Sequence, residues 1–186
     1  MANGQTMEMD QSIELVQSIN MDNDPLGKLC HEAHQDDYSK TRGCSGCVKF
    51  FAYKLAVFLP SICDTADGRA NVLIDYMNTN WTKITKDQAL FQAQTGRLVV
   101  AGKKAEPGHA GHVVVILPAI AEPKNHWGKG RLSLVCCSMT IPGTGYAGAI
   151  IDANATVFDA WGTENGVEYW LSTNGPSACD GKPLMR

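Results

Sequence analysis

Cys44 and His112 are the two residues of this sequence whose types and positions could form a nucleophile and its base. Cys44 lies in residues 43–48 (GCSGCV) and begins a run with apolar residues at helical spacing. His112 begins an apolar run, 113–117, that predicts a strand. A helix N-terminus favours a thiolate, and an imidazole can accept the thiol proton and later return it to a leaving group. The pattern therefore predicts nucleophilic catalysis by Cys44 with His112 as its base.

Both residues also have a plain structural interpretation. A lone cysteine is most often a buried packing residue, and a histidine at a strand start can simply cap the strand. His109 is a competing base three residues before His112, within a polar loop expected over 103–110. We prefer His112 because a strand fixes the direction of its side chain.

Cys44 and Cys47 also form a C-x-x-C motif, which is typical of a redox pair or of half a zinc site. A thioredoxin-like motif should follow a strand, but residues 36–42 are polar. A structural zinc needs two further ligands. Residues 30–34 (CHEAH) could supply them, although they do not match H-E-x-x-H. A thiol–disulfide or zinc-binding protein is therefore the alternative, whereas the catalytic interpretation needs no metal or other cofactor.

The composition is that of one globular domain spanning residues 1–186. The chain is 44% hydrophobic and 19% charged, with a net charge of −3 and no Lys/Arg-rich stripe, so nucleic acid is not expected as a partner. Its apolar runs are too short for a membrane span. Residues 1–23 lack the apolar core of a signal peptide, which predicts synthesis in the cytoplasm, and residues 1–10 look like a loose leader. The seven cysteines are an odd number, so at least one stays unpaired within the chain.

Hydrophobic periodicity and turn residues predict helices first and strands afterwards. The expected helices cover 11–19, 30–38, 44–59, 67–76 and 86–94, and the expected strands cover 97–101, 113–117, 132–139 and 155–161. Residues 39–43 are expected to form a loop. Residues 143–148 match G-x-G-x-x-G, but without a following helical pattern they predict only a glycine-rich loop. This order favours an α+β fold, with N-terminal helices packed on an antiparallel sheet.

The segment 43–48 resembles the Asp/Asn-Cys-Ser-Gly-Phe-Val block of NlpC-type peptidoglycan hydrolases. Residues 96–102 and 111–116 are similar to the Gly-Asp-Leu-Val and His-Val-Gly-Ile blocks of the same hydrolases. A closer resemblance is to the first amidase-effector family of bacterial type VI secretion systems, and it covers roughly residues 40–165. This chain differs in having Cys47 where the pattern has Phe and Gly43 where it has Asp or Asn.

The resemblance implies a papain-like, NlpC-type cysteine peptidase. It implies an amidase that cleaves the D-glutamyl–meso-diaminopimelate bond of peptidoglycan in the periplasm of a recipient Gram-negative cell. Delivery would use the type VI secretion apparatus, and a cognate periplasmic immunity protein would block the enzyme. Cys44 and His112 would be catalytic, and Cys137 would occupy the third catalytic position. Ser45, Gly46 and Gly111 would contact substrate.

The same effectors have cysteines near both termini, and on that basis we expect a disulfide between Cys30 and Cys179. A non-catalytic binding or adhesion domain is a further class, since such a domain would tolerate the loss of both Cys44 and Cys47. Substituting the two cysteines separately distinguishes these classes.

Overall fold

An antiparallel sheet and five helices make up the described part of the computed structural model, which comprises residues 23–60, 69–106, 111–124, 128–139 and 155–173. The helices are α1 (Pro25–Gln35), α2 (Asp37–Lys54), α3 (Arg69–Asn80), α4 (Lys86–Gln94) and α5 (Val157–Trp161). The strands are β1 (Thr82–Ile84), β2 (Val99–Lys103), β3 (His112–Ala121), β4 (Ser133–Cys137), β5 (Ala155–Thr156) and β6 (Glu168–Leu171). The helix expected over 11–19 and the leader lie outside the described residues.

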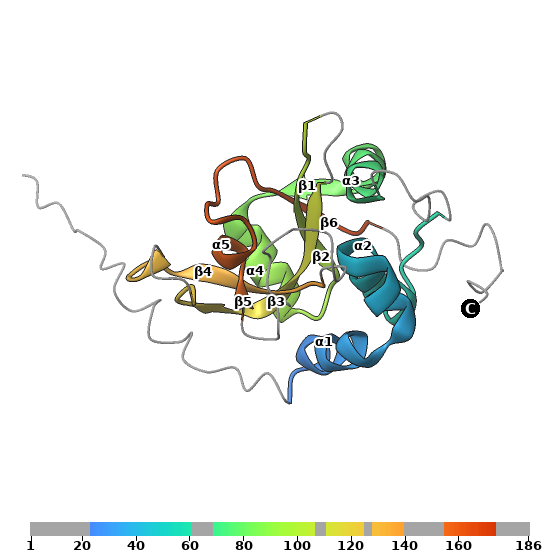
Figure 1. Cartoon of the computed structure of the whole chain (residues 1–186), viewed down its shortest axis with the longest axis horizontal. Helices are drawn as coiled ribbons and strands as arrows, with labels where there is room; N and C mark the ends of the chain where they lie inside the picture. Colours follow the sequence, from blue (N-terminus) through green and yellow to red (C-terminus); the bar gives the residue numbers. More distant parts are fainter. Residues whose placement is uncertain (1–22, 61–68, 107–110, 125–127, 140–154, 174–186) are drawn as a thin grey trace, which may run out of the picture.

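The six strands form one sheet in the order β1-β6-β2-β3-β4-β5, and every neighbouring pair is antiparallel (Figure 1). This confirms the α+β class with an antiparallel sheet. Its central strand β3 lies between β2 and β4, with Val100 opposite Val115 and Ile116 opposite Cys136. Residues 113–117 are fully buried, which is what a continuous apolar run predicts for a strand covered on both faces.

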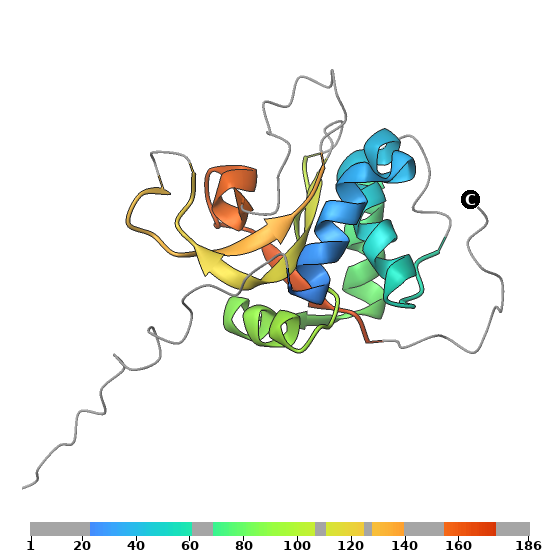
Figure 2. The ribbon, with the colours of Figure 1, turned by 90° about the horizontal axis from the view of Figure 1, so that it is seen from below.

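The helices bury the sheet from more than one direction. Helices α1, α2 and α3 lie together at one side of it, α4 packs against β3 and β6, and α5 lies beside β4 and β5 (Figures 1 and 2). Both α2 and α4 contact β3, which accounts for the burial of both faces of that strand. The start of β3 and a point within α2 are therefore held close together by the packing of the core.

Two expectations about the helix that carries Cys44 are wrong. The loop expected over 39–43 is helical, because α2 already begins at Asp37, where Asp36 caps it by accepting a hydrogen bond from the backbone N–H of Ser39 at 2.9 Å. The helix also ends earlier than expected, at Lys54 rather than near Pro60. Local hydrogen bonding by Asp36 outweighs the polar, loop-like composition of this segment.

The helix predicted over 86–94 is confirmed with the same bounds. Thr85 and Gln88 form a reciprocal capping box: the Gln88 N–H donates to the Thr85 hydroxyl at 3.2 Å, and the Thr85 N–H donates to the Gln88 side chain at 2.9 Å. These two bonds satisfy backbone donors that the first turn of a helix leaves without partners.

The strand expected over 155–161 is wrong beyond its first two residues. Thr156 and Asp159 form a second capping box, which starts α5 at Val157 and ends the strand at Thr156. The strand expected over 113–117 is longer than predicted, because β3 continues past Pro118 to Ala121 through an irregular register between Ile116 and Ile120. A proline without an N–H is tolerated at such an irregularity. The sequence did not predict strands β1 and β6. In the sheet, β6 lies between β1 and β2.

Candidate active site

Cys44 stands at the start of a helical segment because Gly43 breaks α2. The backbone of Gly43 has a φ of 62° and a ψ of −140°, so two helical pieces meet there and the second begins with Cys44. A positive φ is unfavourable for residues with a Cβ, which explains the glycine at this position. The Cys44 side chain is half-buried, and its thiol is free. The thiol therefore lies at the positive end of a helix dipole, as the sequence predicts.

The first piece of α2 packs directly against the second. A Cβ at Gly46 would lie 2.6 Å from the Cβ of Arg42 and 3.1 Å from the Cα of Ser39. Gly46 is buried by these neighbours of its own helix. It therefore has a packing role within α2, and its expected contact with substrate stays a prediction.

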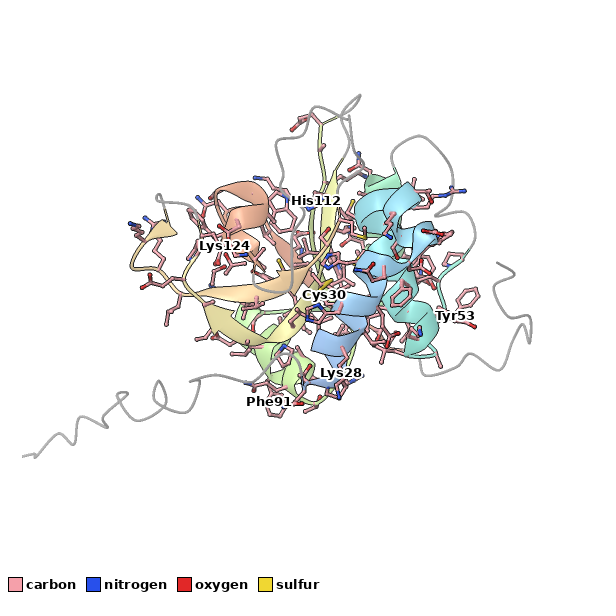
Figure 3. The ribbon with its side chains drawn as sticks, turned by 60° about the horizontal axis from the view of Figure 1, so that its bottom comes forward. Lys28, Cys30, Tyr53, Phe91, His112 and Lys124 are labelled. Atoms are coloured by element: carbon pink, nitrogen blue, oxygen red, sulfur yellow. A yellow bond between two sulfur atoms is a disulfide. The ribbon has the colours of Figure 1, made fainter. Side chains whose placement is uncertain are left out.

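His112 is the first residue of β3 and lies opposite Lys103 of β2 (Figure 3). Its half-buried ring meets the indole of Trp161 in an edge-to-face arrangement, with ring centroids 5.4 Å apart and an interplanar angle of 66°. Strand pairing fixes the backbone, and the indole restricts the ring. His112 is therefore held in direction while part of it stays accessible.

Gly111, the residue before His112, lies against the side chain of Asn71 on α3. The Asn71 side-chain oxygen accepts a hydrogen bond from the N–H of Ala105 at 3.1 Å, which ties α3 to the end of the β2 segment. The same oxygen occupies the space where a Cβ of Gly111 would lie, together with the Lys103 carbonyl at 3.0 Å. Gly111 thus allows the chain to enter β3 close to Asn71. This close approach explains the glycine at 111, and the expected contact of Gly111 with substrate stays a prediction.

Cys44 and His112 interact directly. Burial disfavours the Cys44 thiolate, whereas a hydrogen bond from His112 and the charge of its imidazolium favour it. The backbone N–H of Val113 and the side chain of Ser45 also donate to the sulfur. Together they lower the pKa of Cys44 below its ordinary value. The structure thus brings together the two residues that the sequence selected. Ser45 contacts the sulfur, and its expected contact with substrate stays a prediction.

Two neighbouring thiols have the opposite electrostatic environment. Burial, followed by the charge of Cys44, raises the pKa of Cys47. Burial also raises the pKa of Cys136, and Asp159 and Cys47 add to the effect. Both side chains are fully buried and free, so they remain protonated and are poor nucleophiles. The C-x-x-C motif therefore contains one activated thiol and one packing thiol.

Cys137 does not orient His112. Its sulfur is bonded to that of Cys30, with 5.8 Å between the two Cα atoms, and it lies 3.7 Å from the sulfur of Cys47. A sulfur in a disulfide has no thiol proton and no negative charge to offer an imidazole. The third catalytic position assigned to Cys137 is therefore wrong in this structure. The expected partner of Cys30 is also wrong, because Cys30 pairs with Cys137; Cys179 lies outside the described residues.

Sequence analysis missed Trp161 as a contact of the candidate base. Trp161 ends the apolar run 155–161, which indicated a buried element. That run was predicted to be a strand, whereas its last five residues form α5. Two other features named from the sequence, His109 and the glycine-rich segment 143–148, lie outside the described residues. Separately, Cys30, His34 and Cys137 place three donor atoms within 4.8 Å of one another and could hold a metal ion.

Comparison of the sequence with protein-family models and with curated proteins finds no match. None of the helices within the described ranges combines the length and hydrophobicity that crossing a bilayer requires. The chemistry of Cys44 and His112 is therefore the main evidence for a function.

Proposed function

We propose that this protein is a cysteine amidase that hydrolyses peptide bonds of peptidoglycan. The observation that carries the proposal is the hydrogen-bonded pair of Cys44 and His112, in which the pKa of the Cys44 thiol is lowered. A thiolate beside an imidazolium at a helix start is the arrangement that nucleophilic amide hydrolysis requires.

In the first step, the Cys44 thiolate attacks the carbonyl carbon of the scissile amide. His112 holds the proton that came from the thiol and transfers it to the amide nitrogen as the C–N bond breaks. The amine leaves, and the acyl group stays bound to the Cys44 sulfur as a thioester. In the second step, His112 takes a proton from water and the resulting hydroxide attacks the thioester carbonyl. The C–S bond breaks, the carboxylic acid product leaves, and the Cys44 thiolate beside protonated His112 is regenerated.

The structure suits these steps in three ways. The imidazole is fixed by β3 and by Trp161, so it can face the sulfur through both steps. Val113 and Ser45 stabilise the thiolate before attack. Cys47, the other thiol of the motif, is buried and protonated, so it does not compete as a nucleophile.

The substrate is proposed from the resemblance of residues 43–48, 96–102 and 111–116 to NlpC-type and amidase-effector sequences. It is the D-glutamyl–meso-diaminopimelate bond of the peptide stem. A helix that begins with Cys44 and packs on an antiparallel strand that begins with His112 supports a papain-like, NlpC-type arrangement. Delivery through a type VI secretion apparatus into a rival cell, and a periplasmic immunity protein that covers Cys44 and His112, belong to the same proposal.

Purified muropeptides test the activity. Wild-type protein should release two fragments cut between D-glutamate and diaminopimelate, and Cys44→Ala should lower the rate by about 10³-fold or more while leaving the fold intact. Cys136→Ala is the matched control, because it removes a buried thiol that has no contact with His112 in the proposed mechanism. Full activity of Cys44→Ala, or intact muropeptides with folded wild type, would refute the amidase.

Compartment-specific expression tests the biological target. A copy directed to the periplasm of a Gram-negative host should lyse the cell, and a cytoplasmic copy should be harmless. Equal toxicity from the two compartments, or no toxicity from periplasmic protein with intact Cys44 and His112, would exclude the cell wall as the target.

A further inference from the structure

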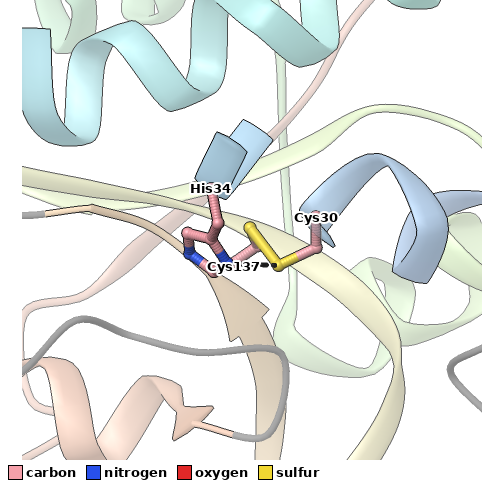
Figure 4. Close-up of side chains that lie close together, drawn as sticks. All are labelled: Cys30, His34 and Cys137. Atoms are coloured by element: carbon pink, nitrogen blue, oxygen red, sulfur yellow. Dashed lines mark hydrogen bonds between the residues drawn. A yellow bond between two sulfur atoms is a disulfide. The ribbon is translucent and has the colours of Figure 1, made fainter. Parts of the chain in front are cut away.

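A second group of sulfur and imidazole donors comes from α1 and β4, and one of its sulfurs, that of Cys137, lies 3.7 Å from the sulfur of Cys47. Cys30 and His34 are one helical turn apart on α1, and Cys137 is the last residue of β4 (Figure 4). The Cys30 sulfur lies 4.0 Å from Nδ1 of His34, and the three donor atoms all lie within 4.8 Å of one another. Cys30 and Cys137 are fully buried, whereas His34 is half-buried.

A hydrogen bond fixes which nitrogen of His34 faces the sulfurs. Nε2 of His34 lies 3.1 Å from the backbone carbonyl oxygen of Ser138. A carbonyl can only accept, so Nε2 carries the proton and donates it. Nδ1 is then left with its lone pair, and this is the nitrogen next to Cys30. An imidazole that donates one N–H to a backbone carbonyl and presents its other nitrogen is the arrangement seen at metal-bound histidines.

We propose that Cys30, His34 and Cys137 bind a zinc ion when the Cys30–Cys137 disulfide is reduced. Two thiolates and an imidazole are ligands that zinc prefers, usually in tetrahedral geometry. Two sulfurs on one tetrahedral zinc are separated by about 3.8 Å, given Zn–S bonds of about 2.3 Å. The sulfurs of Cys30 and Cys137 are bonded to each other in the disulfide, so they have to move apart on reduction to admit the ion. The sulfur of Cys47 lies 3.7 Å from that of Cys137 but is not one of the three clustered donors, so water supplies the fourth ligand in this proposal.

Zinc binding and the disulfide exclude each other because both use the sulfurs of Cys30 and Cys137. A disulfide oxidant such as oxidised glutathione would take two electrons from the two thiolates. An S–S bond forms between Cys30 and Cys137, the S–S bond of the oxidant becomes two thiols, and the zinc ion is released. The chain would therefore carry zinc in a reducing compartment and the disulfide in an oxidising one. This inference does not depend on the amidase activity.

Cobalt is the spectroscopic probe for this site. Full-length protein reduced with a phosphine should bind one Co²⁺ per chain and show thiolate-to-cobalt charge-transfer absorption together with the visible bands of a tetrahedral complex. Added Zn²⁺ should abolish both signals by displacing the cobalt. Absence of the charge-transfer band from folded, reduced protein would overturn the proposal.

Matched substitutions separate ligands from neighbours. His34→Ala should weaken cobalt binding by at least about tenfold, whereas His31→Ala, on the exposed side of the same helix, should leave it unchanged. Cys137→Ser should remove the charge-transfer band, whereas Cys136→Ser should keep it. Circular dichroism identifies any variant that fails to fold. Equal affinity of His34→Ala and wild type would overturn the site even if the cysteine variants were unstable.

Oxidation gives an independent test. Treating the cobalt-loaded protein with oxidised glutathione should remove the band and release the metal at the rate at which the Cys30–Cys137 disulfide appears in peptide mass spectra. Retention of cobalt by protein with a complete Cys30–Cys137 disulfide would contradict the assignment of these two ligands.

Discussion

Among the described residues, sulfur is paired with imidazole at two places, and the two pairings differ in what surrounds the sulfur. At Cys44, a hydrogen bond and a charge from His112, together with hydrogen bonds from Val113 and Ser45, outweigh burial, and the side chain is half-buried. In the cluster of Cys30, His34 and Cys137, both sulfurs are fully buried and bonded to each other. The comparison teaches that a nearby histidine is not enough to make a nucleophile. The sulfur must also be free of a disulfide and have donors that together outweigh its burial.

Cys47 lies between the two pairings and makes the contrast sharper. It is one helical turn from Cys44, but its pKa moves in the opposite direction because burial and then the charge of Cys44 both raise it. One turn of α2 therefore separates a reactive thiol from an inert one.

The largest expected effect concerns the two imidazoles. His112→Ala should lower kcat/KM for muropeptide hydrolysis by roughly 10²–10⁴-fold, because proton transfer to and from the reacting groups is lost. His34→Ala in the disulfide-bonded protein should leave kcat/KM unchanged, since that ring contacts Cys30 and Ser138 but not Cys44. Comparable losses in both variants would show that the two pairings do not differ in function.

The next effect concerns stability. Here a substitution in the cluster of Cys30, His34 and Cys137 should have a larger effect than a substitution of Cys44. The Cys30–Cys137 disulfide joins residues separated by 107 positions. Closing so long a loop constrains the unfolded chain, so Cys30→Ser should lower the free energy of unfolding by about 4–5 kcal/mol in the chain-entropy model. Cys44→Ser should change it by less than about 1 kcal/mol. Urea denaturation of oxidised wild type and the two variants measures these changes in the free energy of unfolding. An unfolding midpoint of Cys30→Ser equal to that of wild type would contradict the stabilising role of the Cys30–Cys137 disulfide.

The smallest effect concerns the packing that places Cys44. Ala is normally better than Gly in a helix, by about 0.5–1 kcal/mol. Gly46→Ala should instead lower the free energy of unfolding by about 1–3 kcal/mol, because its Cβ would lie 2.6 Å from that of Arg42. A stabilised Gly46→Ala would show that the first piece of α2 does not pack tightly on the second. Thermal denaturation distinguishes the two outcomes.

The parts of the site predicted from sequence are those encoded by local patterns. The residues around Cys44 carry glycines at a helix start, and the run after His112 is apolar without interruption, so both positions were found. The Thr85 capping box lies within four residues, and its helix was predicted with the correct bounds.

The features that the sequence did not predict depend on contacts between residues far apart in the chain, or on two local patterns that favour different structures. The pairing of Cys30 with Cys137 follows from the packing of α1 near β4, which no short pattern encodes. Strand β6 is short and is recognised only through its pairing with β1 and β2. The run 155–161 is apolar enough for a strand, but the capping box of Thr156 and Asp159 stabilises a helix that begins at Val157.

The central claim, that His112 activates Cys44, is tested most directly by alkylation of the intact protein across a range of pH. Wild-type and His112→Ala proteins are treated with iodoacetamide, and fragment mass spectra of residues 43–49 report Cys44 and Cys47 separately. In wild type, Cys44 should be modified at pH values below about 8.5, the usual thiol pKa, while Cys47 stays unmodified. His112→Ala should shift the modification of Cys44 to higher pH, since the interaction that lowers the pKa of Cys44 is lost. Equal rates at Cys44 and Cys47, or an unchanged pH profile in His112→Ala, would contradict the claim.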